Sequence, residues 1–529
     1  MRKIYLTALS LLSLGVQAQN IESSTSVLNF SSTNELQLTT DTVIVRNPGI
    51  YPVEVTDVDL FSIYGDEPFT LTDTAFTIAA QDSFLLEVSF TPEHNIMHNM
   101  ALVLKTNTGF GHVGVELKAQ GTYSKTYYAS TQNLTEESLK LALKTCLGQG
   151  YTQLSYSGAR DNMYATIDND GGDVECVYTG RTATFNTRSG ANSNSFNCEH
   201  TFPQGFFNQN LPMRSDIHHL FSTDVTANSQ RGNLPFGVVS SASWTQGGSK
   251  KSSSLFEPRD AHKGACARAM MYFVIRYQDY SNHFSGQESI LRQWHNTYAP
   301  SVGEKDRNDA IFNVQNNRNP FVDYPQFEER ITNFVSNSAE APNASIYFSD
   351  DTLFMAKAAG HYNYHFVAYN DGNQNITLSG FALSDTSLTF AGGNPNTVTL
   401  APGDVYDVNI RFNAANIYAN ELLTLSVDGQ VETFPIYSTG NVLIGLKENK
   451  VSTVNQVKIY PNPVHETLQL ESLVAIKSVK VVNAAGEVVP AYFNESNERL
   501  QLNEIPEGIY LLEITLQNGE KIIERVVKN

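Results

Sequence analysis

Cysteine is scarce in this sequence, with four among 529 residues. So few cysteines exclude a small scaffold that relies on disulfide bonds in place of a hydrophobic core. Charged residues make up 17% and hydrophobic residues 41%, a balance that excludes a disordered or fibrous chain. At roughly 100–200 residues per domain, the length predicts about three to five folded domains.

Basic residues are outnumbered by acidic ones, 35 to 54, and the net charge is −19. This excess of acid argues against nucleic-acid binding by the chain as a whole, because phosphate groups need local positive potential. The excess lies in the flanking regions, since residues 124–335 hold 19 basic and 20 acidic side chains. A nearly neutral central region can still carry a basic cleft.

Long apolar runs are missing after the N-terminus. At the N-terminus, the apolar run Ile4–Val16 follows the basic start Met1-Arg2-Lys3. It precedes a small residue, Ala18, that is typical of a signal-peptide cleavage site. This pattern predicts a secretory signal peptide over residues 1–18, cleaved after Ala18. A membrane anchor is the alternative, but the run is too short to span a bilayer well. We expect an exported protein with no membrane-spanning segment, in a compartment where disulfide bonds can form.

A weak internal repeat brackets the middle of the chain. Ile78–Phe90 resembles Leu400–Phe412 in the spacing of its aspartate, aromatic and apolar residues. Upstream, the turn sequence Asn47–Gly49 parallels Asn370–Gly372. Apolar residues at every second position between turn signals predict half-buried strands.

Residues 20–122 and 338–441 are therefore expected to form two immunoglobulin-like β-sandwiches. Neither copy carries a catalytic pattern, so the default expectation is a spacer or a weak glycan-binding module. The polar stretch 442–456 lacks strong periodicity and is predicted to be a linker.

The last segment, residues 457–529, contains Tyr460-Pro461-Asn462-Pro463 and, near its end, a strand pattern with Gly508 and Tyr510. It closely resembles the C-terminal sorting domain of type IX secretion substrates. The resemblance implies passage across the outer membrane by the type IX secretion machinery, then release or attachment at the cell surface. Taken without the resemblance, the segment predicts a third small β-sandwich with no targeting role.

The central region, residues 123–337, changes to helical periodicity, and an α+β domain dominated by helices is expected there. Helices are predicted with Thr135 as an N-cap, over His262–Tyr277 and over Gln287–Tyr298.

All four cysteines lie in this central region. Four cysteines allow three pairings, and the sequence does not choose among them. We favour Cys146 with Cys266 and Cys176 with Cys198. Reduced thiols in the core are the alternative for the first pair.

Candidate catalytic side chains concentrate between Asn197 and Gly237, where three histidines, three carboxylates and two arginines occur. One interpretation is a zinc site of His200, His218 and His219. Adjacent histidines diverge on a strand or a helix, and the spacing matches no usual zinc signature, so this interpretation is weak.

A second interpretation is a magnesium-dependent phosphodiester hydrolase. Glu199 and Asn228 would supply ligand oxygens, and a neutral His200 would take a proton from the attacking water. Because neighbours on a strand face opposite sides, a bulge or the strand end must re-aim Glu199 or His200. Asn228 is expected on a helix that opens near Asp224 and ends near Gly232. A third interpretation is a hydrogen-bonded cluster without catalysis.

Several motifs in this region resemble the endonuclease I family of secreted bacterial nucleases over about residues 125–335. The motifs are Cys198-Glu-His-Thr-Phe-Pro-Gln204, Ser215-Asp-Ile-His-His-Leu220, Asn228 with Arg231-Gly-Asn233, Pro235-Phe-Gly237, Lys263–Tyr272, Glu304–Ile311 and Gln315–Asp323. The resemblance implies a ββα-metal site and cleavage of DNA, and often RNA, with little sequence preference.

By this resemblance, His200 is the general base, and Glu199 and Asn228 occupy the positions that bind a single Mg²⁺, with Ca²⁺ or Mn²⁺ as substitutes. Arg231 is the first candidate for a phosphate clamp. Arg214 is the second candidate, although some relatives carry an acidic residue at its position.

Asp216 and His218 are expected to contact the loop and the metal-binding side chains, and to orient them, without binding the metal themselves. The sequence thus predicts a secreted, metal-dependent, largely non-specific endonuclease. The alternative is a non-enzymatic surface adhesin whose nuclease domain has degenerated.

Overall fold

The computed structural model describes residues 21–60, 67–277, 281–356, 361–413 and 415–439, and most of residues 457–528. The predicted signal peptide and the predicted linker lie outside the described residues. The chain divides into two compact units, Met1–Ile444 and Gly445–Asn529. No helix among the described residues is long and apolar enough to cross a membrane.

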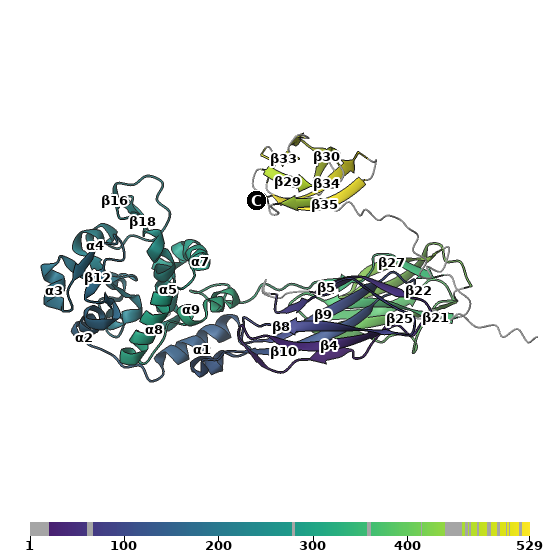
Figure 1. Ribbon diagram of the computed structural model, residues 1–529, viewed down its shortest axis with the longest axis horizontal. Helices are drawn as coiled ribbons and strands as arrows, with labels where there is room; N and C mark the ends of the chain where they lie inside the picture. The colour runs from purple at the N-terminus through teal and green to yellow at the C-terminus, as the bar shows by residue number, and fades with distance from the viewer. Residues whose placement is uncertain are drawn as a thin grey trace, which may run out of the picture. The chain divides into compact units, whose positions relative to one another are not determined.

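The N-terminal part of the first unit is a pair of sheets around a shared apolar core (Figure 1). One sheet has the order β1-β4-β8-β6, and the other has the order β2-β10-β9-β5-β7, with β3 also paired to β10. Alternate residues of the strands point into the core, as the period-two pattern predicts. The strands are β1 (Glu22–Ser23), β2 (Val27–Asn29), β3 (Thr33–Asn34), β4 (Thr39–Arg46), β5 (Val53–Leu60), β6 (Phe69–Leu71), β7 (Phe76–Ile78), β8 (Ser83–Phe90), β9 (Met97–Thr106) and β10 (Val113–Thr122).

A second pair of sheets follows the helical region. Its sheets have the orders β19-β21-β25-β23 and β20-β27-β26-β22-β24. The strands are β19 (Ile346–Phe348), β20 (Leu353–Ala356), β21 (His361–Asn370), β22 (Ile376–Leu383), β23 (Thr389–Phe390), β24 (Val398–Leu400), β25 (Val405–Asn413), β26 (Glu421–Val427) and β27 (Gln430–Thr439). Both pairs are β-sandwiches; their immunoglobulin-like character and their exact boundaries stay predictions.

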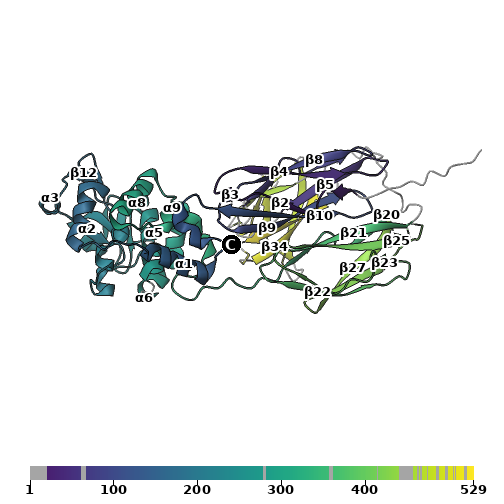
Figure 2. The ribbon, with the colours of Figure 1, turned by 90° about the horizontal axis from the view of Figure 1, so that it is seen from below.

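The internal repeat corresponds to matching structure in the two sandwiches. Asn47 donates its amide hydrogens to the carbonyls of Tyr51 and Ile78, and Asn370 does the same to Gln374 and Leu400. In each copy the asparagine oxygen accepts a hydrogen bond from the glycine two residues on. The two sandwiches lie side by side (Figure 2), and they contact each other through one apolar cluster of Ala101, Val103, Val367 and Tyr369.

The region between the sandwiches is dominated by helices, as predicted. The long helix α5 is buried on nearly all sides, from His262 to Arg276, rather than on one face only. The helices are η1 (Thr126–Thr131), α1 (Glu136–Gly148), α2 (Tyr156–Asn162), η2 (Met163–Ile167), α3 (Arg188–Ser193), η3 (Gln204–Phe207), η4 (Met213–Ser215), η5 (Ile217–His219), α4 (Val225–Arg231), α5 (Asp260–Tyr277), α6 (Ser281–Phe284), η6 (Ser285–Gln287), α7 (Glu288–Thr297), α8 (Val302–Gln315), α9 (Pro320–Asp323) and η7 (Pro325–Arg330). The strands are β11 (Asn169–Asp170), β12 (Asp173–Glu175), β13 (Thr182–Thr184), β14 (Phe196–His200), β15 (Leu220–Asp224), β16 (Trp244–Gln246), β17 (Ser249–Lys251) and β18 (Phe256–Glu257).

Buried contacts join the helical domain to the first sandwich. Arg330 is 1% exposed and donates a hydrogen bond of 2.7 Å to the side chain of Asn95. Tyr123 stacks on Tyr324 with ring centroids 3.7 Å apart. The first sandwich therefore supports the helical domain directly.

The second unit consists of two further sheets, β28-β29-β33-β32 and β31-β30-β34-β35. Gly508 opens β34, and the buried Tyr510 donates a hydrogen bond to the Pro506 carbonyl. Residues Pro461–Pro463 of the predicted start motif lie outside the described residues. The strands are β28 (Lys458–Tyr460), β29 (Thr467–Glu471), β30 (Ile476–Asn483), β31 (Val488–Val489), β32 (Tyr492–Asn494), β33 (Arg499–Gln501), β34 (Gly508–Leu516) and β35 (Lys521–Lys528).

Neither favoured disulfide bond is present, because all four cysteines are free and buried. Cys146 contacts the Ser130 hydroxyl at 3.1 Å, and Cys176 accepts a hydrogen bond of 3.2 Å from the Asp224 amide. Burial raises the pKa of Cys198 to about 12 and moves the pKa of Cys266 further upward. The thiols therefore act as small core side chains, a role that the sequence left open for Cys146 and Cys266.

Candidate active site

The candidate site is built on two antiparallel strands followed at once by a short helix. In β14 and β15, Cys198 pairs with Ser222 and His200 pairs with Leu220. Asp224 ends β15 and caps α4, because its carboxylate accepts a hydrogen bond of 2.7 Å from the Ala227 amide. The helix ends at Gly232, whose φ is positive. The predicted opening and ending of this helix are thus confirmed, and the order is strand, strand, helix.

Glu199 lies on β14 and is 2% exposed. Tyr178 donates a hydrogen bond of 2.8 Å to its Oε1, and the Arg231 Nε lies 3.4 Å from the same oxygen. Burial raises the pKa of Glu199 to about 7, although Arg231 and Tyr178 act in the opposite direction. Because both partners approach Oε1, Oε2 is the oxygen left for a ligand.

Asn228 projects from α4 toward the same strand. Its Nδ2 donates to Asn197 Oδ1 at 2.9 Å and to the Cys198 carbonyl at 3.2 Å. With the nitrogen directed at β14, the Asn228 Oδ1 is left as an acceptor next to the strand that carries Glu199. A carboxylate and an amide oxygen, completed by waters, form a donor set that suits Mg²⁺. Within the described ranges, no three His, Cys, Asp or Glu side chains are grouped so that they could hold a metal.

His200 is the last residue of β14, so the strand end lets its side chain leave the strand alternation. Its Nε2 lies 3.1 Å from the main-chain carbonyl of Arg214. A carbonyl only accepts, so Nε2 carries the proton and Nδ1 holds the lone pair. Burial lowers the pKa of His200 to about 3, and the neighbouring His219 contributes to the shift. The imidazole is therefore neutral near pH 7, with Nδ1 as its basic atom.

The three histidines do not converge as a zinc site would require. The Nε2 atoms of His218 and His219 donate to two other carbonyls, those of Asn317 and Met213. His200 donates to a third carbonyl, so the Nε2 atoms of all three rings are occupied, although the rings of His200 and His219 lie 5.6 Å apart. This geometry does not support the zinc interpretation.

Arg231 lies in a position that differs from the expected phosphate clamp. It is 1% exposed, with Nη1 donating to the Gly232 carbonyl and Nη2 to the Thr201 carbonyl. Its Nε faces Glu199, and its guanidinium covers the ring of Phe236. Both Nη atoms are bonded to main-chain carbonyls, and the buried Nε makes no hydrogen bond but lies 3.4 Å from the Glu199 Oε1. The arrangement therefore favours a role in holding Glu199 over contact with the substrate.

Asp216 is fully buried in a hydrogen-bond network behind the site. It accepts bonds of 2.7 Å from the hydroxyls of Tyr272 and Tyr277 and lies 3.5 Å from Arg276. Burial by itself would raise the pKa of Asp216, but Arg276 and the other partners hold it below its usual range. Asp216 also accepts from the amide of His218, so it orients the loop, as expected, without touching Glu199 or Asn228.

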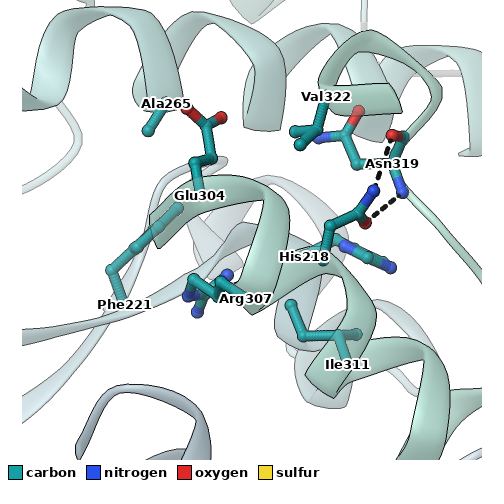
Figure 3. A pocket seen from close by; sticks show the side chains of 9 residues that line it. His218, Phe221, Ala265, Glu304, Arg307, Ile311, Asn319 and Val322 are labelled. Atoms are coloured by element: carbon teal, nitrogen blue, oxygen red, sulfur yellow. Dashed lines mark hydrogen bonds between the residues drawn. The ribbon is translucent and has the colours of Figure 1, made fainter. Parts of the chain in front are cut away.

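His218 lines a small cavity of about 20 Å³ next to helix α8, and Glu199 is not among the residues that line it. Figure 3 shows Glu304 and Arg307 at this cavity, with Asn319 hydrogen-bonded to Asn308. A space of this size holds a single water molecule at most, so it is too small for a substrate.

Arg214 lies on η4, with its guanidinium carbon 4.5 Å from the centre of the Tyr156 ring. That ring is in turn 5.5 Å from the ring of His200. The sequence interpretation missed Tyr156 and Tyr178. No local signal points to Tyr178, because it lies 21 residues before the carboxylate that it contacts.

Comparisons with known proteins find matches for two parts of the chain. The model of the endonuclease I family matches residues 135–326, and that of the secretion system C-terminal sorting domain matches residues 458–529. The extracellular ribonuclease of Bacillus subtilis (strain 168) is 30% identical over 226 residues, which cover 39% of this chain and 78% of that protein. The extracellular ribonuclease of Bacillus amyloliquefaciens is 29% identical over 228 residues, with the same two coverages. Among solved structures, the E. coli chaperone DraB is 16% identical in sequence, and the match covers 20% of this chain and 58% of the chaperone chain. Its TM-score of 0.17 is too low to support a conclusion.

Proposed function

This chain belongs to the endonuclease I family and is a secreted or cell-surface nuclease; on that premise we propose that it hydrolyses phosphodiester bonds of DNA and RNA with the help of a single Mg²⁺. The observation that carries the proposal is the occurrence of Glu199, His200 and Asn228 on one strand-strand-helix unit in which Asn228 is hydrogen-bonded to the strand of the other two. The names of the two extracellular ribonucleases support the inclusion of RNA among the substrates.

Glu199 Oε2 and Asn228 Oδ1 are the atoms that would hold the ion, with Ca²⁺ or Mn²⁺ as possible replacements. When bound, the ion would supply positive charge for the phosphate and for the leaving oxygen. Arg231 and Tyr178 keep the Glu199 carboxylate in place from the opposite side. Their contacts fix the rotamer of a buried side chain, which lowers the cost of ordering it when the ion binds.

His200 acts as the general base in this proposal. Its Nδ1 accepts a proton from the attacking water while Nε2 stays bound to the Arg214 carbonyl. That carbonyl also stabilises the positive charge that the ring acquires during the step, since an oxygen dipole faces the protonated imidazole. Burial holds the pKa of His200 below its usual range, so the ring is unprotonated near pH 7.

The alternative is a surface adhesin with a degenerate nuclease domain. The complete set of Glu199, His200 and Asn228, each with its supporting contacts, counts against degeneration. Incubation of the purified protein with plasmid DNA and with RNA, with and without EDTA, tests the proposal. We expect cleavage of both substrates that EDTA abolishes. Binding without cleavage, at any concentration of added Mg²⁺, would favour the adhesin.

A further inference from the structure

Two arginines lie on one tyrosine ring beside His200. Tyr156 and Arg160 are four residues apart on α2, so they share a face of that helix. Arg214 reaches the same ring from η4. The guanidinium carbons of Arg160 and Arg214 lie 4.2 and 4.5 Å from the ring centre. All three side chains are half-buried, so each keeps some exposure to solvent.

These two guanidiniums lack a counter-charge. Across the described part of the chain, neither side chain has a hydrogen bond or an ion pair, and the Nε of each is buried and unpaired. The nearby carboxylates are already engaged, since Asp161 pairs with Arg188 at 2.6 Å and Asp168 pairs with Arg307 at 2.8 Å. Two positive charges that each lie within 4.5 Å of one ring centre repel each other, and an anion that contacts both lowers that repulsion.

The position of the cluster indicates which anion it receives. The Tyr156 ring is 5.5 Å from the His200 ring, and the main-chain carbonyl of Arg214 holds the His200 Nε2. A phosphate bound next to His200 would therefore lie close to the cluster. Guanidinium groups bind phosphate oxygens through paired N–H donors, and neighbouring phosphates are the only anions on the substrate backbone.

The geometry points to Tyr156, Arg160 and Arg214 as a binding site for the backbone phosphate adjacent to the bond that is cut. This inference rests on the proposed function and goes beyond it, because it adds Arg160 and Tyr156 and gives Arg214 a flanking phosphate. Tyr156 serves as the rigid support on which the two guanidiniums are held. It thereby keeps the donors in place before the substrate arrives.

The test measures how cleavage depends on salt. Arg160→Gln and Arg214→Gln are made in the full chain, and kcat/KM is measured on a fluorescent single-stranded oligonucleotide over a series of NaCl concentrations. A lost contact to a charged group should lower kcat/KM at low salt by about 10- to 100-fold. The slope of log kcat/KM against log salt should become shallower by about 0.7 for each arginine that contacts one phosphate of a single strand. Arg411→Gln, which removes an exposed charge from β25 in the second sandwich, is the matched control and should leave the slope unchanged.

An unchanged slope in both glutamine variants would overturn the inference, because arginines with only a structural role release no counterions from the substrate. Thermal unfolding of each variant shows whether it is folded. If the glutamine variants fail to fold, Arg160→Lys and Arg214→Lys replace them. These variants keep the positive charge, so the slope of log kcat/KM against log salt should equal that of the wild type. A shallower slope in folded lysine variants would also overturn the inference. Failure of the proposed function is distinct, since the wild type would then not cleave. Fluorescence anisotropy with the same oligonucleotide would still show whether Arg160 and Arg214 set the salt dependence of binding.

Discussion

Replacement of Arg231 distinguishes support of Glu199 from contact with the substrate. Arg231→Met keeps a long side chain but removes the charge that faces Glu199 and the donors to the Thr201 and Gly232 carbonyls. Both members of the pair are at most 2% exposed. Loss of one partner of such a buried pair costs about 3–5 kcal/mol, a large part of the 5–15 kcal/mol by which a domain is commonly stable.

The lower end of that range is expected here. Burial already raises the pKa of Glu199 to about 7, so the unpaired carboxyl can take up a proton and avoid a buried charge. A loss of about 3 kcal/mol corresponds to a fall of about 1–3 M in the urea midpoint. The double variant Arg231→Met, Glu199→Gln should lose less stability than the two single variants lose in total. In the double variant both charges of the pair are gone, so neither is left buried without a partner.

Tryptophan fluorescence reports on the relevant domain alone. The chain has two tryptophans, and both, Trp244 and Trp294, lie in the helical domain. Urea titration followed by this signal therefore measures the unfolding of that domain without the sandwiches or the tail. Arg214→Met is the matched control, since its guanidinium has no ion pair among the described residues, and its midpoint should stay close to that of the wild type. An Arg231→Met protein that is inactive but unfolds at the wild-type midpoint would refute this reasoning and restore Arg231 as a phosphate clamp.

Three further predictions concern the base, the tail and the pH dependence of stability. His200→Ala should lower turnover by about 10²–10⁴-fold, while Mg²⁺ binding, measured by calorimetry, persists. Glu199→Ala should lose both activity and Mg²⁺ binding. A His200→Ala protein that cleaves at the wild-type rate would exclude His200 as the general base. A chain that ends at residue 439 should keep its nuclease activity, because the tail forms a compact unit of its own; inactivity or unfolding of the truncated chain would show that the tail is structural. Burial lowers the pKa of His262 to about 3 and that of His295 to about 4. The unfolded chain takes up protons at these histidines below about pH 6.5 while the folded chain does not, so stability should fall from about pH 6.5 toward pH 4. The tryptophan-detected urea midpoint should accordingly be lower at pH 5 than at pH 7, and His262→Phe should reduce the difference; equal midpoints at both values would contradict it.

Local features of the fold could be predicted from the sequence because neighbouring residues determine them. The Asp224 carboxylate caps α4 by accepting a hydrogen bond from the amide of Ala227, three residues later along the chain. Gly232 adopts the positive φ at which α4 ends. The asparagines of the two repeat turns likewise bond to groups close to them in each copy. The magnesium-dependent interpretation grouped Glu199, His200 and Asn228 from their residue types and their short separation along the chain, whereas the second strand, β15, became evident only in the structure.

Contacts between distant residues could not be predicted in this way, because they depend on which side chains become buried together. The sequence suggested Arg231 as a phosphate clamp, and only the packing of Thr201, Phe236 and Glu199 around it directs the guanidinium inward. The same holds for Arg160, which meets Arg214 only because α2 packs beside η4. A charge taken out of water must find a partner or bear a large free-energy cost, and its partner is selected by the tertiary arrangement and not by proximity along the chain. The sequence by itself identified the candidate residues, and the tertiary structure decided which of them are turned into the protein and which keep exposure to solvent.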